Sequence, residues 1–294
     1  MVIRKLTNKE ILSLPRLYNS RLSSWAIAKK FNTYHSNILY HLKKLNIKRR
    51  DKSSAAKEGV IAGRIIIKKH KIPKNLKLNE DLSYILGVIA GDGCISYDAN
   101  RQRYQICLGV IDKDFIDEFR KKLYNFFNLK PTEEFRKSKN KNWNDQYVTR
   151  LCSKEACDFI NSIGNFKKDK WRIPEIIKNS NMFVKEAFLK GFFDSEGEID
   201  KKSGRVGAVS MNFVGLNDIS DLLRDLGVKY TIIKKKDSRP NTNQKYVLRI
   251  HDKKSINLFY KKIGFTIKRK QNILKEVLFK NNLIFPRDRD RLVP

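Results

Sequence analysis

Two apolar runs of ten residues, 104 positions apart in the chain, follow one plan. Tyr84–Gly93 reads YILGVIAGDG, and Phe188–Gly197 reads FLKGFFDSEG. Each run has small residues at two positions four apart and ends in an acid followed by glycine. Small residues at i and i+4 lie on one face of a helix, where they let two helix backbones approach closely. We therefore predict two helices that pack face to face, and this pair constrains the rest of the fold.

The acids at the ends of the two runs predict a metal site. If the helices pair face to face, their C-terminal ends meet, and Asp92 comes next to Glu196. Two carboxylates at close range repel each other unless a cation lies between them. Carboxylate oxygens favour a hard divalent cation at such a point.

The two runs carry a family resemblance. ILGVIAGDG and LKGFFDSEG resemble the motif of the LAGLIDADG homing endonucleases, with the family's glycine at Gly87 and Gly191. The family's essential acid falls at Asp92 and Glu196. One such nonapeptide would be a weak signal, because apolar helices that end in Asp-Gly are common. Two copies at the spacing of one repeat favour the family over a plain pair of core helices.

The chain also duplicates outside the two runs. Tyr147–Arg150 (YVTR) is repeated 99 residues later as Tyr246–Arg249 (YVLR). Each copy is followed by an amphipathic stretch that ends in Ile-Gly, at residues 163–164 and 263–264, and then by a basic run. Duplication of this length predicts two similar units related by a pseudo-two-fold axis.

Within each unit the pattern predicts an α+β fold in the order αββαββα. We expect strands within 94–110 and at 146–151, and at 206–214, 229–235 and 244–251, with helices at 114–127 and 218–226. The first repeat is placed at residues 80–180 and the second at 181–294. The resemblance covers about residues 79–285 and implies two antiparallel sheets that form a saddle across double-stranded DNA.

Charge points to the same class of partner. The 294 residues include 63 Lys and Arg against 31 Asp and Glu, a net charge of +32. Such an excess indicates a polyanionic partner. No run of 18 apolar residues is present, so no membrane span is expected. The cysteines have no CxxC spacing and are expected to be buried free thiols, which fits a cytoplasm or an organellar matrix: Cys94, Cys107, Cys152 and Cys157.

The first 79 residues hold 20 of the basic residues and only 3 acidic ones. Residues 1–50 predict an all-α domain with helices at 9–18, after Ser23–Ser24 and at 34–45, and Pro15 predicts a break or a new start within the first. The stretch from Ser23 to Arg50 resembles a helix-turn-helix, and residues 51–79 form a basic linker. The alternative is a small helical domain with a solvated charged face.

In a helix-turn-helix the second helix enters the major groove. The residues that would then face the bases are Tyr34, His35, Ser36, Asn37 and His41. The residues that would contact phosphates without reading sequence are Lys43, Lys44, Lys48, Arg49 and Arg50.

The resemblance implies a metal-dependent hydrolysis of phosphodiester bonds, with one motif acid for each DNA strand. Mg²⁺ is the expected ion and Mn²⁺ a substitute, with the carbonyl groups of Gly91 and Ser195 as further ligands. In this family a lysine of each repeat often stands near the scissile phosphate, and Lys168 and Lys268 match it. Phosphate tethering by any residue of these basic runs, such as Lys167 or Lys170, is an equal alternative.

Specificity is expected on alternating strand positions that face the DNA, because Arg and Gln can pair bidentately with guanine and adenine. These positions are Arg101, Arg103, Gln105 and Arg150 in one unit and Arg205, Gln244 and Arg249 in the other. Part of them would be phosphate contacts or plain surface. The motif copies differ at Ala90 and Asp194, and we interpret the acid there as a structural cap.

Together these features predict a monomeric, site-specific double-strand DNA endonuclease of the intron-homing type. By resemblance it would recognise a long asymmetric site and leave short 3′ overhangs. An intein is not expected, since the sequence neither begins with Cys or Ser nor ends in His-Asn. The competing classes are a non-catalytic DNA-binding regulator and an intron RNA maturase on the same saddle. Both motif acids are retained, which favours the enzyme.

Overall fold

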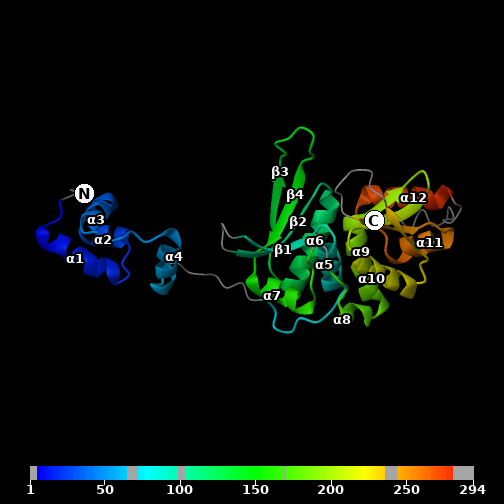
Figure 1. The fold of residues 1–294 in the computed structure, drawn as a ribbon, viewed down its shortest axis with the longest axis horizontal. Helices are drawn as coiled ribbons and strands as arrows, with labels where there is room; N and C mark the ends of the chain where they lie inside the picture. Colours follow the sequence, from blue (N-terminus) through cyan, green and yellow to red (C-terminus); the bar gives the residue numbers. More distant parts are fainter. Residues whose placement is uncertain (1–4, 65–71, 99–102, 168–169, 236–243, 281–294) are drawn as a thin grey trace. The chain divides into compact units, whose positions relative to one another are not determined.

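The structure, a computed structural model, describes residues 5–64, 72–98, 103–167, 170–235 and 244–280 (Figure 1). Two of the predicted site residues, Arg101 and Lys168, lie outside these ranges. The chain divides into two compact units, 1–69 and 70–294, and each is described by itself. Within the ranges given, no helix is long and apolar enough to cross a bilayer.

Within residues 5–64, the N-terminal unit has four helices. They are α1 (Asn8–Asn19), α2 (Ser24–Lys30), α3 (His35–Lys44) and α4 (Lys52–Ile61). The first three pack around a small core that includes Leu14, Ile27 and Ile38. Ser23 caps α2 as expected, because its side chain accepts a hydrogen bond from the Ala26 amide at 3.1 Å.

The predicted break at Pro15 is wrong, because α1 runs through this residue. A proline inside a helix removes one backbone hydrogen bond, and this usually interrupts the helix. Here a capping box between Thr7 and Glu10 fixes the first turn, with the Thr7 amide 2.9 Å from the Glu10 carboxylate. Leu14 and Tyr18 on either side of Pro15 are buried in the core of the unit, and their packing holds the helix together.

The C-terminal unit confirms the αββαββα order in both repeats. The first repeat contains α5 (Glu80–Ala90), β1 (Cys94–Asp98), β2 (Arg103–Val110), α6 (Lys113–Phe127), β3 (Thr132–Arg136), β4 (Gln146–Leu151) and α7 (Lys154–Ile163). A short helix, α8 (Glu175–Lys178), leads to the second repeat. This repeat contains α9 (Met182–Glu196), β5 (Gly197–Asp200), β6 (Arg205–Ser210), α10 (Phe213–Asp225), β7 (Thr231–Lys235), β8 (Lys245–Ile250) and α11 (Lys253–Lys262). Helix α12 (Lys268–Lys280) follows.

One predicted boundary in the second repeat is wrong. The strand expected at 206–214 ends at Ser210, and α10 begins at Phe213 instead of Asp218. The apolar alternation continues through Val214, but the Asn212 side chain accepts a hydrogen bond from the Gly215 amide at 3.0 Å. This cap satisfies a free amide at the helix start and therefore favours a helix over a longer strand.

The two sheets have the same topology. Their strand orders are β1-β2-β4-β3 and β5-β6-β8-β7, and all neighbouring strands are antiparallel. In β2, Ile106 and Leu108 are buried on the face that contacts α6 and α7. The opposite face, which we call the open face, carries Arg103, Gln105 and Cys107 by strict alternation.

The two motif helices lie against each other with their backbones in contact, as predicted. A Cβ atom at Gly87 would lie 2.1 Å from the carbonyl oxygen of Phe188. A Cβ atom at Gly191 would lie 2.3 Å from the carbonyl oxygen of Tyr84, the equivalent contact in the other direction. No side chain can stand at either position, so the two glycines set the distance between α5 and α9.

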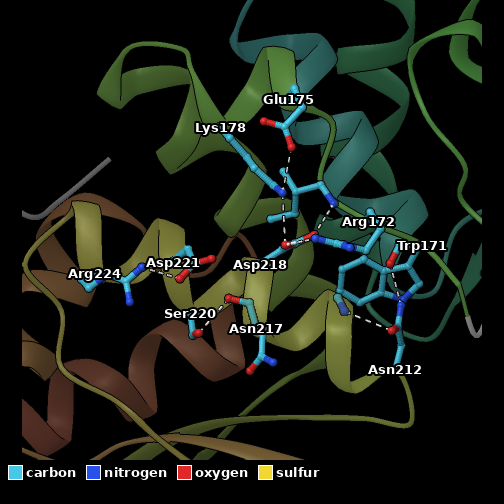
Figure 2. A network of polar contacts seen from close by, with 12 residues as sticks. Trp171, Arg172, Glu175, Lys178, Asn212, Asn217, Asp218, Ser220, Asp221 and Arg224 are labelled. Carbon is cyan, nitrogen blue, oxygen red and sulfur yellow. Dashed lines mark hydrogen bonds and ion pairs between the residues drawn. The ribbon is translucent and has the colours of Figure 1, made fainter.

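The segment after α7 crosses from the first repeat onto the second. Arg172 donates to both carboxylate oxygens of Asp218 in α10, at 2.6 and 2.9 Å (Figure 2). The Ile173 amide also donates to Asp218, at 3.0 Å. Next to this ion pair, the side-chain amide of Asn212 donates to the carbonyl oxygen of Trp171 at 2.6 Å. The crossing segment is thus fixed on α10 by side chains of the second repeat.

The segment after α11 makes the reverse crossing. Arg269 donates to both oxygens of Asp112 at 2.7 and 2.8 Å, and the Lys268 amide donates to Asp114 at 2.6 Å. Asp112 precedes α6 as Asn212 precedes α10, so equivalent positions receive the two crossing segments. The pseudo-two-fold relation therefore extends from the motif helices to these contacts.

Replacing Asp218 by Asn is expected to destabilise the unit by about 1–3 kcal/mol at pH 7. Burial alone would raise the pKa of Asp218, but hydrogen bonds from Arg172, the Ile173 amide and Lys178 outweigh it and lower this pKa. A lowered folded-state pKa stabilises above the unfolded value of 3.8, and this contribution is lost as pH falls through the folded value. Urea denaturation should therefore give a lower free energy of unfolding for the variant than for the native chain at pH 7. In acid, the two free energies should become similar.

The matched control is Asp221→Asn, one turn further along the same helix. Its carboxylate is half exposed and pairs with Arg224, which is also exposed. Exposed pairs of this kind contribute about 0.2–1 kcal/mol. A loss for Asp221→Asn as large as that for Asp218→Asn would contradict the assigned role of the buried carboxylate.

Candidate functional site

The C-terminal ends of α5 and α9 meet at the predicted site. A Cβ atom at Gly91, the residue that ends α5, would lie 2.4 Å from the Cβ of Ser195. The same atom would lie 3.2 Å from the Cγ of Glu196, the last residue of α9. Asp92 follows Gly91 directly, so the fold brings together the helix ends that carry the two acids. Small residues at 91 and 195 make this approach possible.

Asp92 lies in a turn that the Gly93 amide closes by donating to the carbonyl oxygen of Val88 at 2.9 Å. Its side chain keeps an exposed surface. The pKa of Asp92 is raised, because surrounding protein atoms displace part of the water around the carboxylate. The ammonium group of Lys270 offsets part of this rise. A poorly hydrated carboxylate gains more from a nearby cation than a fully hydrated one does.

The groups at the meeting point fit a hard divalent cation. The two carboxylates supply oxygen ligands, and the last carbonyls of both helices carry partial negative charge. Across the ranges that the structure describes, no three His, Cys, Asp or Glu side chains gather into a metal site. The further ligands of an ion held by Asp92 and Glu196 would therefore be backbone carbonyls, water and phosphate oxygens.

Glu196 borders a pocket of about 280 Å³ on the side of the second repeat. Its lining includes Gly91, Trp171, Ser210 and Lys245. Lys245 is a basic residue that the sequence interpretation missed. Its position in the sequence could have indicated this. Lys245 begins β8 and lies two and four residues before Val247 and Arg249, so the three side chains share one face of the strand. Lys245 therefore lines the same pocket as the second motif acid.

The two lysines of the second basic run differ in position. Lys268 has an exposed side chain, and its backbone amide is the group that donates to Asp114. Lys270 is buried, and its ammonium donates to the carbonyl oxygen of Asp194 at 2.9 Å. Burial lowers the pKa of Lys270, and its charge acts on Asp92. The sequence prediction covered Lys270 only as one residue of the second basic run, although its spacing from the buried Leu274 in α12 marks it as facing inward.

The described residues of the first basic run do not mirror those of the second. Lys167 and Lys170 are both exposed, and Lys168 lies outside the described residues. Within the described part of the chain, Lys270 therefore has no equally buried counterpart among these residues. The two halves of the site thus differ in the lysines near them as well as in their acids.

Asp194 has the structural place that we expected. It is buried and accepts hydrogen bonds from the Tyr84 hydroxyl at 2.8 Å and from the Thr266 amide at 2.7 Å. Burial raises its pKa, and these hydrogen bonds oppose the rise. The residue ties α9 to α5 and to the turn before α12.

The open face of the first sheet collects three predicted DNA contacts. Arg103 and Gln105 lie on β2, and the register places Arg150 opposite Cys107 on the same face. The Gln105 amide donates to Ser96 at 3.1 Å, and Arg150 pairs with Glu134 at 2.6 Å. Contact with DNA stays a prediction for all three.

In the second sheet, Arg205 and Arg249 alternate with buried residues and so face the open side. Gln244 precedes β8, and its amide donates at 2.8 Å to the carbonyl oxygens of Lys235 and Lys245. Its donors are therefore engaged by the backbone at the end of the β7–β8 pair. The carbonyl oxygen of its side chain remains the group that a base could use.

The cysteines are only partly as expected. Cys157 is buried, but Cys94 is exposed, and Cys107 and Cys152 are half-buried. The expectation is wrong for Cys94 because it stands on the open face of β1, opposite the helices. Apolar flanks alone do not say which face of a strand a thiol occupies.

In the N-terminal unit, α2 and α3 are joined by a short turn. Tyr34 is exposed at the start of α3, and the Asn37 amide donates to Thr33 at 3.0 Å. His35 stacks on the exposed ring of Trp25, with ring centroids 4.4 Å apart. His41 lies in the last turn of α3, edge-on to the ring of Tyr40.

The cations in the last turn of α3 and directly after it fall into two groups. Lys43, Lys44, Lys48 and Arg49 are exposed. Arg50 instead places its guanidinium over the ring of Tyr18, 4.1 Å from the centroid, and donates to the carbonyl oxygen of Leu22 at 3.2 Å. Arg50 thus fixes the exit from α3 within the unit.

Comparison with known proteins agrees with these features. The family model described as "LAGLIDADG-like domain" matches residues 79–164 and 183–264, more than half of the chain. An uncharacterised protein of Methanocaldococcus jannaschii is 30% identical over 214 residues, which cover 69% of this chain and 73% of that protein. Another from the same organism is 37% identical over 171 residues, 56% of this chain and 61% of that one. The structure of the homing endonuclease I-DmoI in complex with DNA and Ca is 25% identical, with a TM-score of 0.49 over 67% of this chain and 97% of that one.

Proposed function

Because the chain belongs to the LAGLIDADG-like domain family, we propose that it is a site-specific endonuclease that cuts both strands of a DNA duplex. The observation that supports this most directly is the meeting of the helix ends that carry the two motif acids, on helices in backbone contact. A family member that only bound DNA would have no need of both Asp92 and Glu196.

We assign a divalent metal to the acids, with Mg²⁺ as the natural ion, because oxygen ligands, water and phosphate suit it. When bound, the metal supplies an activated water and neutralises charge at phosphorus. Asp92 and Glu196 would supply the carboxylate ligands, with one acid for each DNA strand. The charge of Lys270 acts on Asp92, and Lys245 lines the same pocket as Glu196.

The open faces of the two sheets would bind the duplex. Arg103, Arg150, Arg205 and Arg249 supply positive charge there. Equivalent positions carry different side chains, since Cys107 lies opposite Arg150 where Gly207 lies opposite Arg249. The two half-sites in the DNA would therefore differ in sequence, and one chain with two repeats would suffice as a monomer.

The deciding experiment is digestion of a randomised duplex DNA library by the full chain with Mg²⁺, followed by sequencing of the ends. We expect cuts at one asymmetric sequence, short 3′ overhangs and no cutting in the presence of a chelator. Tight sequence-specific binding without cutting of any DNA would favour a transcription regulator on the same fold. Preference for a structured intron RNA over duplex DNA would favour a maturase.

Lys270→Met is expected to move the acid limb of the cleavage rate to higher pH. The Lys270 charge lowers the pKa of Asp92, so its removal lets that pKa rise further. Asp92 must be deprotonated to hold the metal. A higher pKa of Asp92 means that this deprotonation occurs only at a higher pH. The rate of cutting, measured against pH at fixed Mg²⁺, gives the shift. Lys268→Met is the control, because its exposed side chain should leave the limb in place. A shift caused by Lys268→Met alone would instead support the lysine that the sequence predicted.

We further propose that the N-terminal unit adds a helix-turn-helix type of DNA contact. A chain that begins at Asn79 is expected to bind its target more weakly and with a smaller dependence on salt. Each lost phosphate contact lowers the slope of log affinity against log salt by about 0.9. A second variant is the full chain with Lys43, Lys44 and Arg49 changed to Gln, which keeps the N-terminal unit but loses three positive charges. Comparing its affinity and salt dependence with those of the truncated chain separates the effect of charge from the effect of the unit. Unchanged affinity and slope in the truncated chain would rule out this contact.

A further inference from the structure

Cys94 and Cys107 stand directly opposite each other in the β1–β2 pair. Both lie on the open face of the first sheet, where Cys94 is exposed and Cys107 is half-buried. The Cys107 thiol donates to the carbonyl oxygen of Cys94 at 3.6 Å. The strand register therefore places the two thiols side by side on one face, and Cys94 lies two residues beyond the motif acid Asp92.

The backbone geometry suits a disulfide between them. Residues directly opposite in an antiparallel pair have Cα atoms about 4.5–5.5 Å apart. A disulfide spans about 4.4–6.8 Å between Cα atoms, so the two strands need not separate or slide. The link would enclose the β1–β2 connection and leave the rest of the sheet as it is.

The pair exists in one half of the molecule only, among the residues described. The equivalent positions in the second repeat are Glu198 and Gly207, which face each other in the β5–β6 pair. Cys157 is buried, and Cys152 lies after β4. A thiol-specific change on the open face would thus act on the half that carries Asp92.

We propose that Cys94 and Cys107 form a redox modification site, at which a low-molecular-weight disulfide converts the two thiols into a cross-strand disulfide that slows DNA cleavage. The exposed Cys94 sulfur attacks the small disulfide, forms a mixed disulfide and releases one small thiol. The Cys107 sulfur then attacks Cys94, which forms the Cys94–Cys107 bond and releases the second small thiol. Two electrons and two protons pass from the cysteines to the small disulfide, which leaves as two thiols.

The link would alter the backbone next to the metal ligand. The two sulfurs must approach each other to form a bond of about 2.05 Å. Cys94 is joined to Asp92 through one glycine, so the adjustment is passed to the acid. A misplacement of about 1 Å at a catalytic group can cost about a hundredfold in rate. This effect on cleavage rests on the proposed function, whereas the formation of the disulfide does not.

The chemical test uses the full chain equilibrated with oxidised and reduced glutathione, then alkylated and digested. Trypsin cuts after Arg101 and Arg103, so the two cysteines fall in separate peptides. We expect a linked Cys94–Cys107 peptide pair that grows with the oxidised fraction, disappears with reductant and persists in Cys152→Ser. A Cys94 that stays free, keeps glutathione or links to Cys152 would overturn the modification site.

The functional test compares cutting by the oxidised and reduced chain. We expect the oxidised chain to cut at least about tenfold more slowly and to accumulate nicked duplex, with recovery after reduction. Cys94→Ser and Cys107→Ser should cut at the same rate in both conditions. Equal rates for the oxidised and reduced native chain, with the link present, would overturn the effect on cleavage. If neither form cuts any DNA, the proposed nuclease fails, while the peptide result still decides the modification site.

Discussion

Asp92→Asn and Glu196→Gln are each expected to abolish double-strand cleavage while leaving DNA binding intact. Either change removes a carboxylate that holds the metal, whose charge stabilisation amounts to several kcal/mol. At about 1.4 kcal/mol for each factor of ten, cutting should slow by roughly a thousandfold or more. Supercoiled plasmid that carries the target separates intact, nicked and linear DNA in one gel. Because each acid belongs to a different half, we expect each variant to leave nicked duplex.

Binding and a matched acid provide the controls for these two variants. Removal of a negative charge near the phosphates should leave affinity equal or slightly higher, which a gel-shift titration measures. Glu198→Gln makes the same change two residues beyond Glu196, on an exposed side chain of β5. It should cut at nearly the native rate. Undiminished cleavage by Asp92→Asn or Glu196→Gln would remove that residue from the catalytic site.

The second large effect is expected from the glycines between the motif helices. Gly87→Ala and Gly191→Ala should each lower the free energy of unfolding by about 3 kcal/mol, at the upper end of typical overpacking. In both cases the new methyl group meets a backbone carbonyl oxygen at about 2 Å, and no side chain can turn aside to make room. The better helix propensity of alanine, about 1 kcal/mol, offsets only part of this cost.

Urea denaturation followed by circular dichroism measures both changes. The control is Gly109→Ala in β2, where the nearest atoms would lie 3.6 and 3.8 Å away, in ordinary contact. It should change stability by no more than about 0.5 kcal/mol. The double variant should lose less than the sum, because the first displacement of the helices makes room for the second methyl group. Two small, additive losses would contradict backbone contact at this interface.

The motif helices could be predicted because their information is local. Spacing of small residues in a short run fixes the contact face, and the acids at the ends follow directly. Strand positions such as Gln146–Leu151 could be predicted for the same reason. The end of β6 could not, because the Asn212 cap overrides an apolar alternation that continues through Val214.

Other parts of the site depend on contacts that no local pattern contains. Arg172 and Asp218 are 46 residues apart, and neither stands out from the many charged residues of the chain. The burial of Lys270 could have been predicted, since this residue shares a helix face with Leu274 and Val277. Counting from the Ile-Gly pair selected Lys268 instead, because an internal alignment matches positions and not burial. The exposure of Cys94 likewise depends on which face of the sheet the helices cover.

The two crossing segments have a consequence for how the molecule can be divided. Each repeat contributes a crossing segment that packs on the other repeat. Neither repeat therefore contains both partners of these contacts. Cut between α8 and α9, one fragment would keep Asp112 but lose Arg269, and the other would keep Asp218 but lose Arg172. Each fragment would also expose the apolar side of a motif helix. The two fragments would then fold only together, through the crossing segments that each contributes. Cleavage of DNA would show that they have associated.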